Sequence, residues 1–168
     1  MRNLPGFTIV ELTMAIVIAI ILAGAAVVGL GNIMSGIQLS AATDKLAADL
    51  RYAQGLATSY WVWHGVSLEA APVNRYTLYS TTGTVDSVVN DPARNLDNFI
   101  VNVYSIYGVT ISGVSIDGGS QVEFNPFGVP YTDKAAAAIT AEGVITLARG
   151  AATKTVRLVP ATGRIYIQ

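Results

Sequence analysis

The sequence predicts an α+β fold in which one long N-terminal helix packs on antiparallel β-sheet structure. Three observations support this fold class: an apolar run without charge from Leu12 to Leu30, apolar residues at helical spacing as far as Tyr60, and short β-type runs after Trp61. At 168 residues the chain is long enough for one domain with a core and one further element, and too short for two ordinary domains.

The composition points to protein or lipid partners. The chain is 52% hydrophobic and 12% charged, and its net charge is -1. Binding to nucleic acid needs a surplus of Lys and Arg, so the charge balance disfavours it for the molecule as a whole. The chain has no cysteine, so cysteine usage does not indicate a redox compartment.

The run from Leu12 to Leu30 predicts a membrane-spanning helix, because at about 1.5 Å per residue it can cross a hydrocarbon core about 30 Å thick. A secretory signal peptide is one alternative, with a small-residue cleavage site near Ala23 to Ala26. A buried core helix is another, although such helices rarely stay uncharged for so long.

Glu11 distinguishes these interpretations. A carboxylate costs roughly 2.5 to 3.5 kcal/mol at the centre of a membrane helix, and less near the interface, so it indicates a specific partner. The plain alternative is a first-turn acid at headgroup depth, favoured there by the helix dipole.

The segment Gly6-Phe7-Thr8-Ile9-Val10-Glu11-Leu12 follows a short leader with one basic residue and precedes the uncharged run. It resembles the processing site of type IV pilins and type II secretion pseudopilins. The resemblance implies that a prepilin peptidase cuts between Gly6 and Phe7 and methylates the new amino terminus of Phe7. It makes Glu11 the fifth mature residue, where its carboxylate can pair with the α-amino group of a neighbouring pilin or pseudopilin subunit and so set the register of assembly.

The charge distribution also predicts the topology. Arg2 is the only basic residue before Lys45, so the positive-inside bias places the leader in the cytoplasm and the rest outside. We expect a single-pass protein of the bacterial inner membrane with a periplasmic head, which later enters a pilus or pseudopilus. The expected organisation is a leader peptide at 1–6, a transmembrane helix at 7–30, an amphipathic continuation of the helix at 31–60 and a β-rich head at 61–168.

The continuation carries an apolar stripe of residues spaced three and four apart, which predicts packing against a sheet. The stripe consists of Leu46, Leu50, Ala53, Ala57 and Tyr60, with Asp44, Lys45, Asp49, Arg51 and Gln54 expected on other faces.

Runs rich in Val, Ile, Thr and Tyr predict the strands of the head. They are Arg75 to Ser80, Phe99 to Ile111, Gln121 to Asn125, Val144 to Ala148 and Thr155 to Ile167. The last run contains Pro160-Ala161-Thr162-Gly163 and predicts a terminal hairpin with a short closing strand. The polar segment from Thr81 to Asn98 predicts an exposed loop, where we expect partner contacts.

Three further stretches make the chain similar to the GspH/FimT family of minor pilins and pseudopilins. They are Ala48 to Gln54 in the helix, the turn Glu123 to Gly128, and the end Thr162 to Ile167. This resemblance implies a low-abundance subunit near the tip of the filament that helps to start assembly.

No arrangement of residues indicates catalysis, and we expect no enzyme activity, cofactor, metal or small-molecule substrate. The single His64 has no cysteine or acid and base partner at motif spacing and is expected in a strand or at an edge. Asp117-Gly118-Gly119 lacks the spacing of a calcium loop and predicts a solvated turn.

Two alternative functions remain open. Some FimT-like minor pilins take up DNA through basic residues in the C-terminal region, and this chain has Arg149, Lys154, Arg157 and Arg164 there. Arginine at alternating strand positions is also common on a solvated face. The other alternative is a membrane-anchored periplasmic protein of different function, which would need no cut after Gly6.

Overall fold

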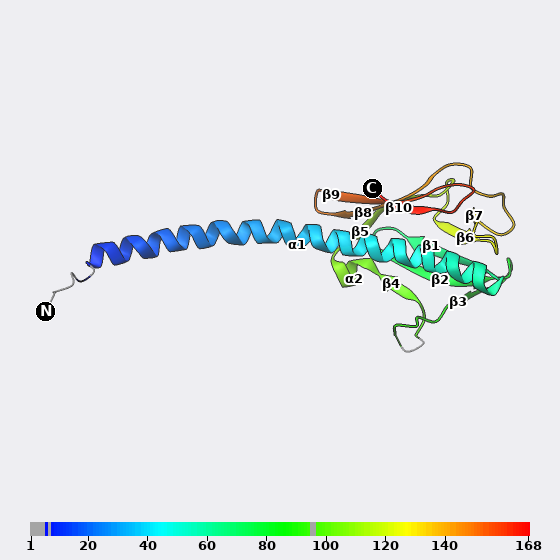
Figure 1. Ribbon diagram of the computed structural model, residues 1–168, viewed down its shortest axis with the longest axis horizontal. Coiled ribbons are helices and arrows are strands. Elements are labelled where there is room, and N and C mark those ends of the chain that lie inside the picture. Colours follow the sequence, from blue (N-terminus) through cyan, green and yellow to red (C-terminus); the bar gives the residue numbers. More distant parts are fainter. Residues whose placement is uncertain (1–5, 7, 95–96) are drawn as a thin grey trace. The chain divides into compact units, whose positions relative to one another are not determined.

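The computed structural model describes residues 6, 8–94 and 97–168, and for residues 25–30 and 32 it describes the backbone alone (Figure 1). The chain divides into two compact units, a first unit of residues 1–36 and a second unit of residues 37–168. Helix α1, Ile9–Tyr60, has 52 residues and contributes to both units. The expectation of one continuous helix as far as Tyr60 is therefore confirmed.

In the first unit, the described apolar side chains of α1 are exposed. Those with the largest side chains are between 50% and 83% exposed: Ile9, Val10, Leu12, Met14, Ile16, Val17, Ile18, Ile20, Ile21, Leu22, Ile33 and Met34. Within the described residues, no helix combines the length and apolar character needed to cross a membrane. The transmembrane segment predicted at 7–30 includes residue 7 and the side chains of 25–30, which lie outside the described residues.

The second unit contains two antiparallel sheets, and Figure 1 shows α1 running beside their strands. The first sheet has the order β3-β2-β1-β6-β7, with β4 also paired to β2, and the second has the order β10-β9-β8-β5. The first consists of β1 Trp63–Glu69, β2 Arg75–Thr81, β3 Asp86–Val88, β4 Ile100–Asn102, β6 Gln121–Phe124 and β7 Pro130–Tyr131. The second consists of β5 Thr110–Ser115, β8 Gly143–Arg149, β9 Ala152–Leu158 and β10 Ile165–Ile167.

The predicted stripe on α1 forms the helical side of the core. Leu46, Leu50 and Ala57 are fully buried, Ala53 is nearly so, and they belong to one cluster with apolar residues of both sheets. Tyr60 departs from the prediction, because it is 69% exposed at the end of the helix. The stripe therefore covers the sheets through residue 57 and stops there.

Asp49 also departs from the prediction, because it is buried rather than on an outer face. Both of its carboxylate oxygens accept hydrogen bonds from Lys45 Nζ at 2.6 Å, and Oδ2 also accepts one from the hydroxyl of Tyr76 at 2.5 Å. The hydroxyl on β2 thus compensates the loss of water at this carboxylate. Burial next to Asp49 raises the pKa of Tyr76 far above its ordinary value, so its hydroxyl stays protonated as a donor.

Most predicted strands are present, including the terminal hairpin. Strand β9 pairs with β10 in antiparallel register, and Gly163 between them has a φ of 63°, in the left-handed region that favours glycine. The prediction of one strand from Phe99 to Ile111 is wrong. That segment holds β4, the short helix α2, Val103–Tyr107, and the start of β5.

The interruption by α2 has a local cause. The side chain of Asn102 accepts a hydrogen bond from the Ser105 backbone N–H at 2.8 Å and caps the helix at its start. Gly108 ends the helix in the left-handed conformation, with a φ of 63°. These two caps outweigh the β preference of the Val, Ile and Tyr residues between them.

The segment from Thr81 to Asn98 is exposed for most of its described length, as predicted, but it is not only loop. It contains β3, which pairs with β2. It also contains Asp91, which is buried and accepts a hydrogen bond from the Ala93 backbone N–H at 2.9 Å. This carboxylate therefore stabilises a turn.

Candidate functional site

The start of α1 is organised by Thr8. Its side-chain oxygen accepts a hydrogen bond from the Glu11 backbone N–H at 3.2 Å, and its carbonyl accepts one from Leu12 N–H at 3.1 Å. A threonine followed three residues later by glutamate is the spacing of a capping box. The helix therefore begins at Ile9, three residues after Gly6.

Gly6 has no structural requirement for glycine in the described part of the chain. It is exposed outside the helix, and a Cβ added there would meet no atom within 4 Å. Neither packing in this chain nor a left-handed backbone thus explains the residue. Phe7, predicted as the site of cleavage and methylation, lies outside the described residues.

Glu11 lies in the first turn of α1 among exposed apolar side chains. Its carboxylate forms no hydrogen bond or ion pair with any described residue of the chain. The helix dipole favours an acid at this position, as the plain interpretation of Glu11 requires. A carboxylate on an otherwise apolar surface is also placed to bind a cationic group from outside the chain.

Two of the four basic residues predicted for DNA binding lie near Tyr166 of β10. Arg157 on β9 forms an ion pair with Glu142 at 2.5 Å, and Arg164 lies over the Tyr166 ring at 5.5 Å from its centroid. The Tyr166 hydroxyl donates a hydrogen bond to Glu142 at 2.5 Å. Hydrogen bonds from Tyr166 and Arg157 lower the pKa of Glu142, so this carboxylate stays charged beside Arg157.

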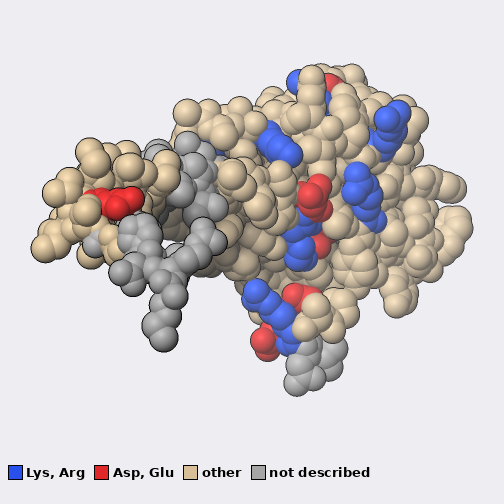
Figure 2. All heavy atoms as spheres, turned by 60° about the vertical axis from the view of Figure 1, so that its left-hand side comes forward, with Lys and Arg blue, Asp and Glu red and all other residues tan. Residues whose placement is uncertain are grey.

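The other two basic residues, Arg149 and Lys154, contact different parts of the second unit. Arg149 donates a hydrogen bond to the carbonyl of Tyr107. Lys154 Nζ donates one to the hydroxyl of Ser40 on α1 at 2.9 Å. On the face drawn in Figure 2, Lys and Arg side chains are separate from one another, and acidic side chains lie beside several of them.

All four basic residues therefore contact groups of their own chain, which leaves less of their charge for phosphate. DNA binding stays a prediction. Salt-dependent binding of the full-length chain to duplex DNA tests it, and no binding at low salt would remove it.

The three stretches quoted for the GspH/FimT resemblance meet in space. From α1, Gln54 Nε2 donates a hydrogen bond to the carbonyl of Gly128 at 2.9 Å and lies 3.5 Å from that of Thr162. One turn earlier, Arg51 Nη2 donates to the carbonyl of Ile165 at 2.9 Å. These bonds attach the helix to the turn between β6 and β7 and to the hairpin of β9 and β10, so the three stretches hold the head together.

His64 is a strand residue, as expected, but it lies on β1 between β2 and β6 and not at an edge of the sheet. Its Nδ1 is 2.8 Å from the carbonyl of Val62, and burial lowers the pKa of the imidazole. Among the described residues, no three His, Asp or Glu side chains are close enough to hold a metal ion. Asp117 is exposed in a turn, as predicted, and its carboxylate accepts backbone hydrogen bonds from residues 140 and 141.

Comparison with solved structures identifies the fold. The chain is similar to the type IV minor pilin FimU of Pseudomonas aeruginosa in two crystal forms. In space group P21 the TM-score is 0.53 at 11% identity over 81% of this chain and 92% of that one. In space group P65 the TM-score is 0.51 at 13% identity over 77% and 92%. No protein-family model matches the sequence, and no curated protein matches it.

The likeness covers 81% of this chain in one comparison and 77% in the other. At this level of identity it shows a shared fold. The chain therefore has a type IV pilin fold, an α+β arrangement in which an N-terminal helix packs on antiparallel sheets.

Proposed function

We propose that the chain is the precursor of a minor pilin or pseudopilin, a subunit of a type IV pilus or a type II secretion system. A prepilin peptidase cuts it between Gly6 and Phe7 and methylates Phe7. Other pilin or pseudopilin subunits then contact the first part of α1. The role is structural, and the partners are subunits, the peptidase and, before assembly, lipid.

The observation that carries the proposal is the position of the predicted cleavage motif relative to a pilin fold. Thr8, within the motif, caps α1, and the helix begins at Ile9, so the bond between Gly6 and Phe7 precedes the helix in the sequence. A peptidase needs its substrate in an accessible, non-helical segment. Glycine at position 6 has no explanation in the fold, which is consistent with selection by an enzyme site that excludes a side chain.

Glu11 is the assembly residue of this proposal. After the cut, the chain has a new α-amino group four residues before its carboxylate. The Glu11 carboxylate has no partner among the described residues, and a neighbour's α-amino group would neutralise both charges in an apolar environment. This pairing fixes the register between two adjacent helices.

The exposed apolar surface of α1 supports a location in the inner membrane followed by a filament core. Side chains such as Ile16 and Leu22 are at least half exposed and must be covered by lipid or by other helices. The proposed sequence of environments is a single-pass span with the head in the periplasm, and then the pilus or pseudopilus. A place near the filament tip follows from the GspH/FimT resemblance, and the fold shared with a minor pilin supports it.

The test replaces Glu11 by leucine and, separately, by the nearly isosteric glutamine. Both variants are expected to be cut after Gly6 as the wild type is, while their incorporation into the filament is lost, because neither can neutralise an amine. Mass spectrometry of the amino terminus reads the first result, and the subunit content of sheared filaments reads the second. Asp44→Asn, which removes an exposed carboxylate further along α1, is the matched control. Normal incorporation of Glu11→Gln would contradict the proposal.

A further inference from the structure

Four segments of the second unit meet where its part of α1 begins. Lys154 of β9 donates a hydrogen bond to Ser40 of α1 at 2.9 Å, and Arg149 of β8 donates one to the carbonyl of Tyr107 at the end of α2. The backbone N–H at the start of α2 donates to the carbonyl of Asn74, in the turn between β1 and β2, at 2.9 Å. Figure 1 shows α2 and the turn between β8 and β9 together at this end of the sheets.

Apolar side chains are exposed on this surface. Tyr104 and Ile106 of α2 are 59% and 47% exposed, and Val73, in the turn before β2, is 41% exposed. With Arg149 and Lys154 they form a mixed apolar and basic surface, the α2 end of the head. Tyr and apolar side chains next to Lys and Arg are typical of membrane surfaces, where the apolar groups enter the headgroup layer.

The basic residues of the α2 end are not paired with acids. In the described part of the chain, Arg149 and Lys154 bond a carbonyl and a hydroxyl, so no carboxylate neutralises either charge. The nearby ion pair of Glu69 and Arg75 has no net charge, and Asp44 of α1 is a single exposed acid. The α2 end therefore keeps an excess of positive charge.

The α2 end also lies close in the chain to the apolar run. Ser40 follows Leu30 by about ten residues of α1, which is a rise of about 15 Å. The headgroup layer takes up about 5 to 8 Å beyond the hydrocarbon core. The proposed function, on which this inference rests, places the apolar run in a membrane. A tether this short then holds lipid headgroups at a high effective concentration beside the α2 end.

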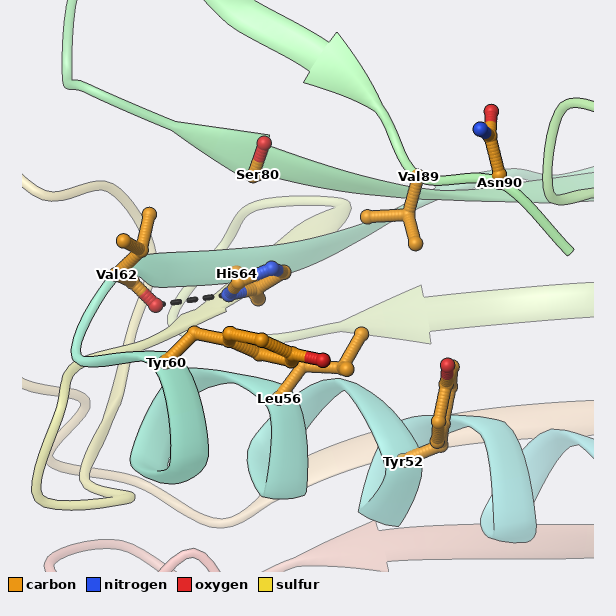
Figure 3. A pocket seen from close by; sticks show the side chains of 8 residues that line it. All are labelled: Tyr52, Leu56, Tyr60, Val62, His64, Ser80, Val89 and Asn90. Carbon is orange, nitrogen blue, oxygen red and sulfur yellow. Dashed lines mark hydrogen bonds between the residues drawn. The ribbon is translucent and has the colours of Figure 1, made fainter. Parts of the chain in front are cut away.

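A pocket at the other end of the head lacks this charge. It has a volume of about 430 Å³ and lies between the end of α1 and the first sheet (Figure 3). None of its lining residues is Lys, Arg, Asp or Glu: they are Tyr52, Leu56, Tyr60, Val62, His64, Ser80, Val89 and Asn90. Tyr60 is also about 30 Å further along α1 than Ser40. Positive charge and a short tether therefore occur together at the α2 end and not at this pocket.

We propose that the α2 end binds the anionic phospholipid headgroups of the membrane that holds α1. Tyr104 and Ile106 enter the headgroup layer, and Arg149 and Lys154 contact lipid phosphates. This contact orients the head on the membrane before assembly, and the head leaves the lipid when the subunit enters a filament.

Site-directed spin labelling tests this contact, because the chain has no native cysteine. The full-length chain carries a nitroxide at Ser105→Cys on α2 or, as the control, at Val85→Cys in the turn between β2 and β3, where Val85 is 61% exposed. Each protein is inserted into preformed vesicles of phosphatidylcholine, with or without phosphatidylglycerol. Collisions with a water-soluble nickel chelate report the exposure of the label. We expect protection at position 105 but not at 85, and only with phosphatidylglycerol at low salt.

A double variant tests the role of charge. Arg149→Gln with Lys154→Gln removes both cations and keeps hydrogen-bond donors at the two positions. Each removed charge should lower the ratio of bound to unbound heads by about fivefold, so protection at position 105 is lost. Lys134→Gln removes a cation that bonds the Thr82 carbonyl after β2, and should leave the protection unchanged. Circular dichroism shows whether each variant is folded.

Three results would overturn the proposal. They are an accessible label at position 105 in vesicles with phosphatidylglycerol, equal protection at positions 105 and 85, and unchanged protection in the folded double variant. Flotation of the vesicles shows whether the chain is inserted. A chain that does not float would contradict both this proposal and the membrane location in the proposed function. A floating chain with an accessible label would contradict this proposal alone.

Discussion

The two parts of α1 are both rich in apolar residues, but only the part in the second unit buries them within the described chain. Ile16 and Ile20 in the first unit are 50% and 65% exposed, whereas Leu46 and Leu50 are fully buried under the two sheets. Removing apolar surface of this extent from water lowers the free energy. The second part is covered by its own strands, whereas the described apolar side chains of the first part are left exposed.

The largest expected effect comes from removing a buried side chain on the helix. Leu50→Ala should lower the free energy of unfolding by about 2 to 5 kcal/mol, because it leaves a cavity between α1 and the sheets. Leu12→Ala, at a position that is 57% exposed, should change it by less than about 0.5 kcal/mol. Denaturant unfolding of the full-length chain in mild detergent measures both. Equal losses for the two variants would break the contrast between the two parts of the helix.

The next effect concerns the attachment of α1 to the turns. A Cβ on Gly163 would lie 2.4 Å from both Gln54 Nε2 and the carbonyl oxygen of Gly128. Gly163→Ala should therefore cost more than about 2 kcal/mol, since it adds overlap to the strain of a left-handed alanine. Gly150→Ala is the control, with a similar φ of 60° and open space around it, and should cost about 1 kcal/mol. If the thermal unfolding midpoints of the two variants fall equally, the close approach at Gly163 contributes nothing to the loss of stability.

The buried carboxylate on α1 should have a smaller effect. Asp49→Ala leaves the Tyr76 hydroxyl buried without its acceptor and should cost about 1 to 3 kcal/mol. Asp44→Ala changes an exposed residue of the same helix and should be close to neutral. The unfolding of both variants is compared with that of Tyr76→Phe, which removes the donor and leaves the carboxylate with Lys45. A neutral Asp49→Ala would show that this contact does not hold the helix on the sheet.

The smallest expected effect is a pH dependence within the head. Burial raises the pKa of Glu123 above its ordinary 4.5, although it accepts hydrogen bonds from the Tyr79 hydroxyl and the Lys134 backbone N–H. The folded state therefore binds this proton more tightly than the unfolded state does. Its stabilising contribution is fully present below pH 4.5 and is lost as the pH rises through the raised pKa.

The variant Glu123→Gln lacks this titration. The unfolding free energy of the wild type, relative to that of the variant, should therefore fall as the pH rises from below 4.5 through the raised pKa. Unfolding at a series of pH values measures the difference between the two proteins. A difference that stays constant, or grows with pH, would contradict the assignment.

Much of the second unit follows from local patterns in the sequence. The helical spacing of Leu46, Leu50 and Ala53 predicts the buried face of α1, and the turn before Gly163 predicts the last hairpin. Helix α2 was missed because its Val, Ile and Tyr residues favour strands. The capping pattern from Asn102 to Gly108 was nevertheless visible and could have revealed it.

Other features depend on contacts between distant residues and could not be predicted from local patterns. Asp49 has the spacing of the buried stripe, three residues after Leu46 and four before Ala53, but as a charged residue it is expected on an outer face. Only the approach of Tyr76 on β2 makes its burial favourable. The pocket beside Tyr60 combines α1 with residues of β1, β2 and the segment after β3, and no motif relates these segments. For Glu11 and Gly6, by contrast, the motif carries the functional prediction, and the structure adds the cap at Thr8 and the lack of a partner among the described residues.

The central claim is that the chain is cut between Gly6 and Phe7, shortly before the cap of α1, and that other subunits then contact the first part of this helix. Mass spectrometry of the amino terminus of the protein isolated from its natural host tests this most directly. The account predicts a chain that begins at a methylated Phe7. An intact Met1, or a cut well inside α1, would contradict it.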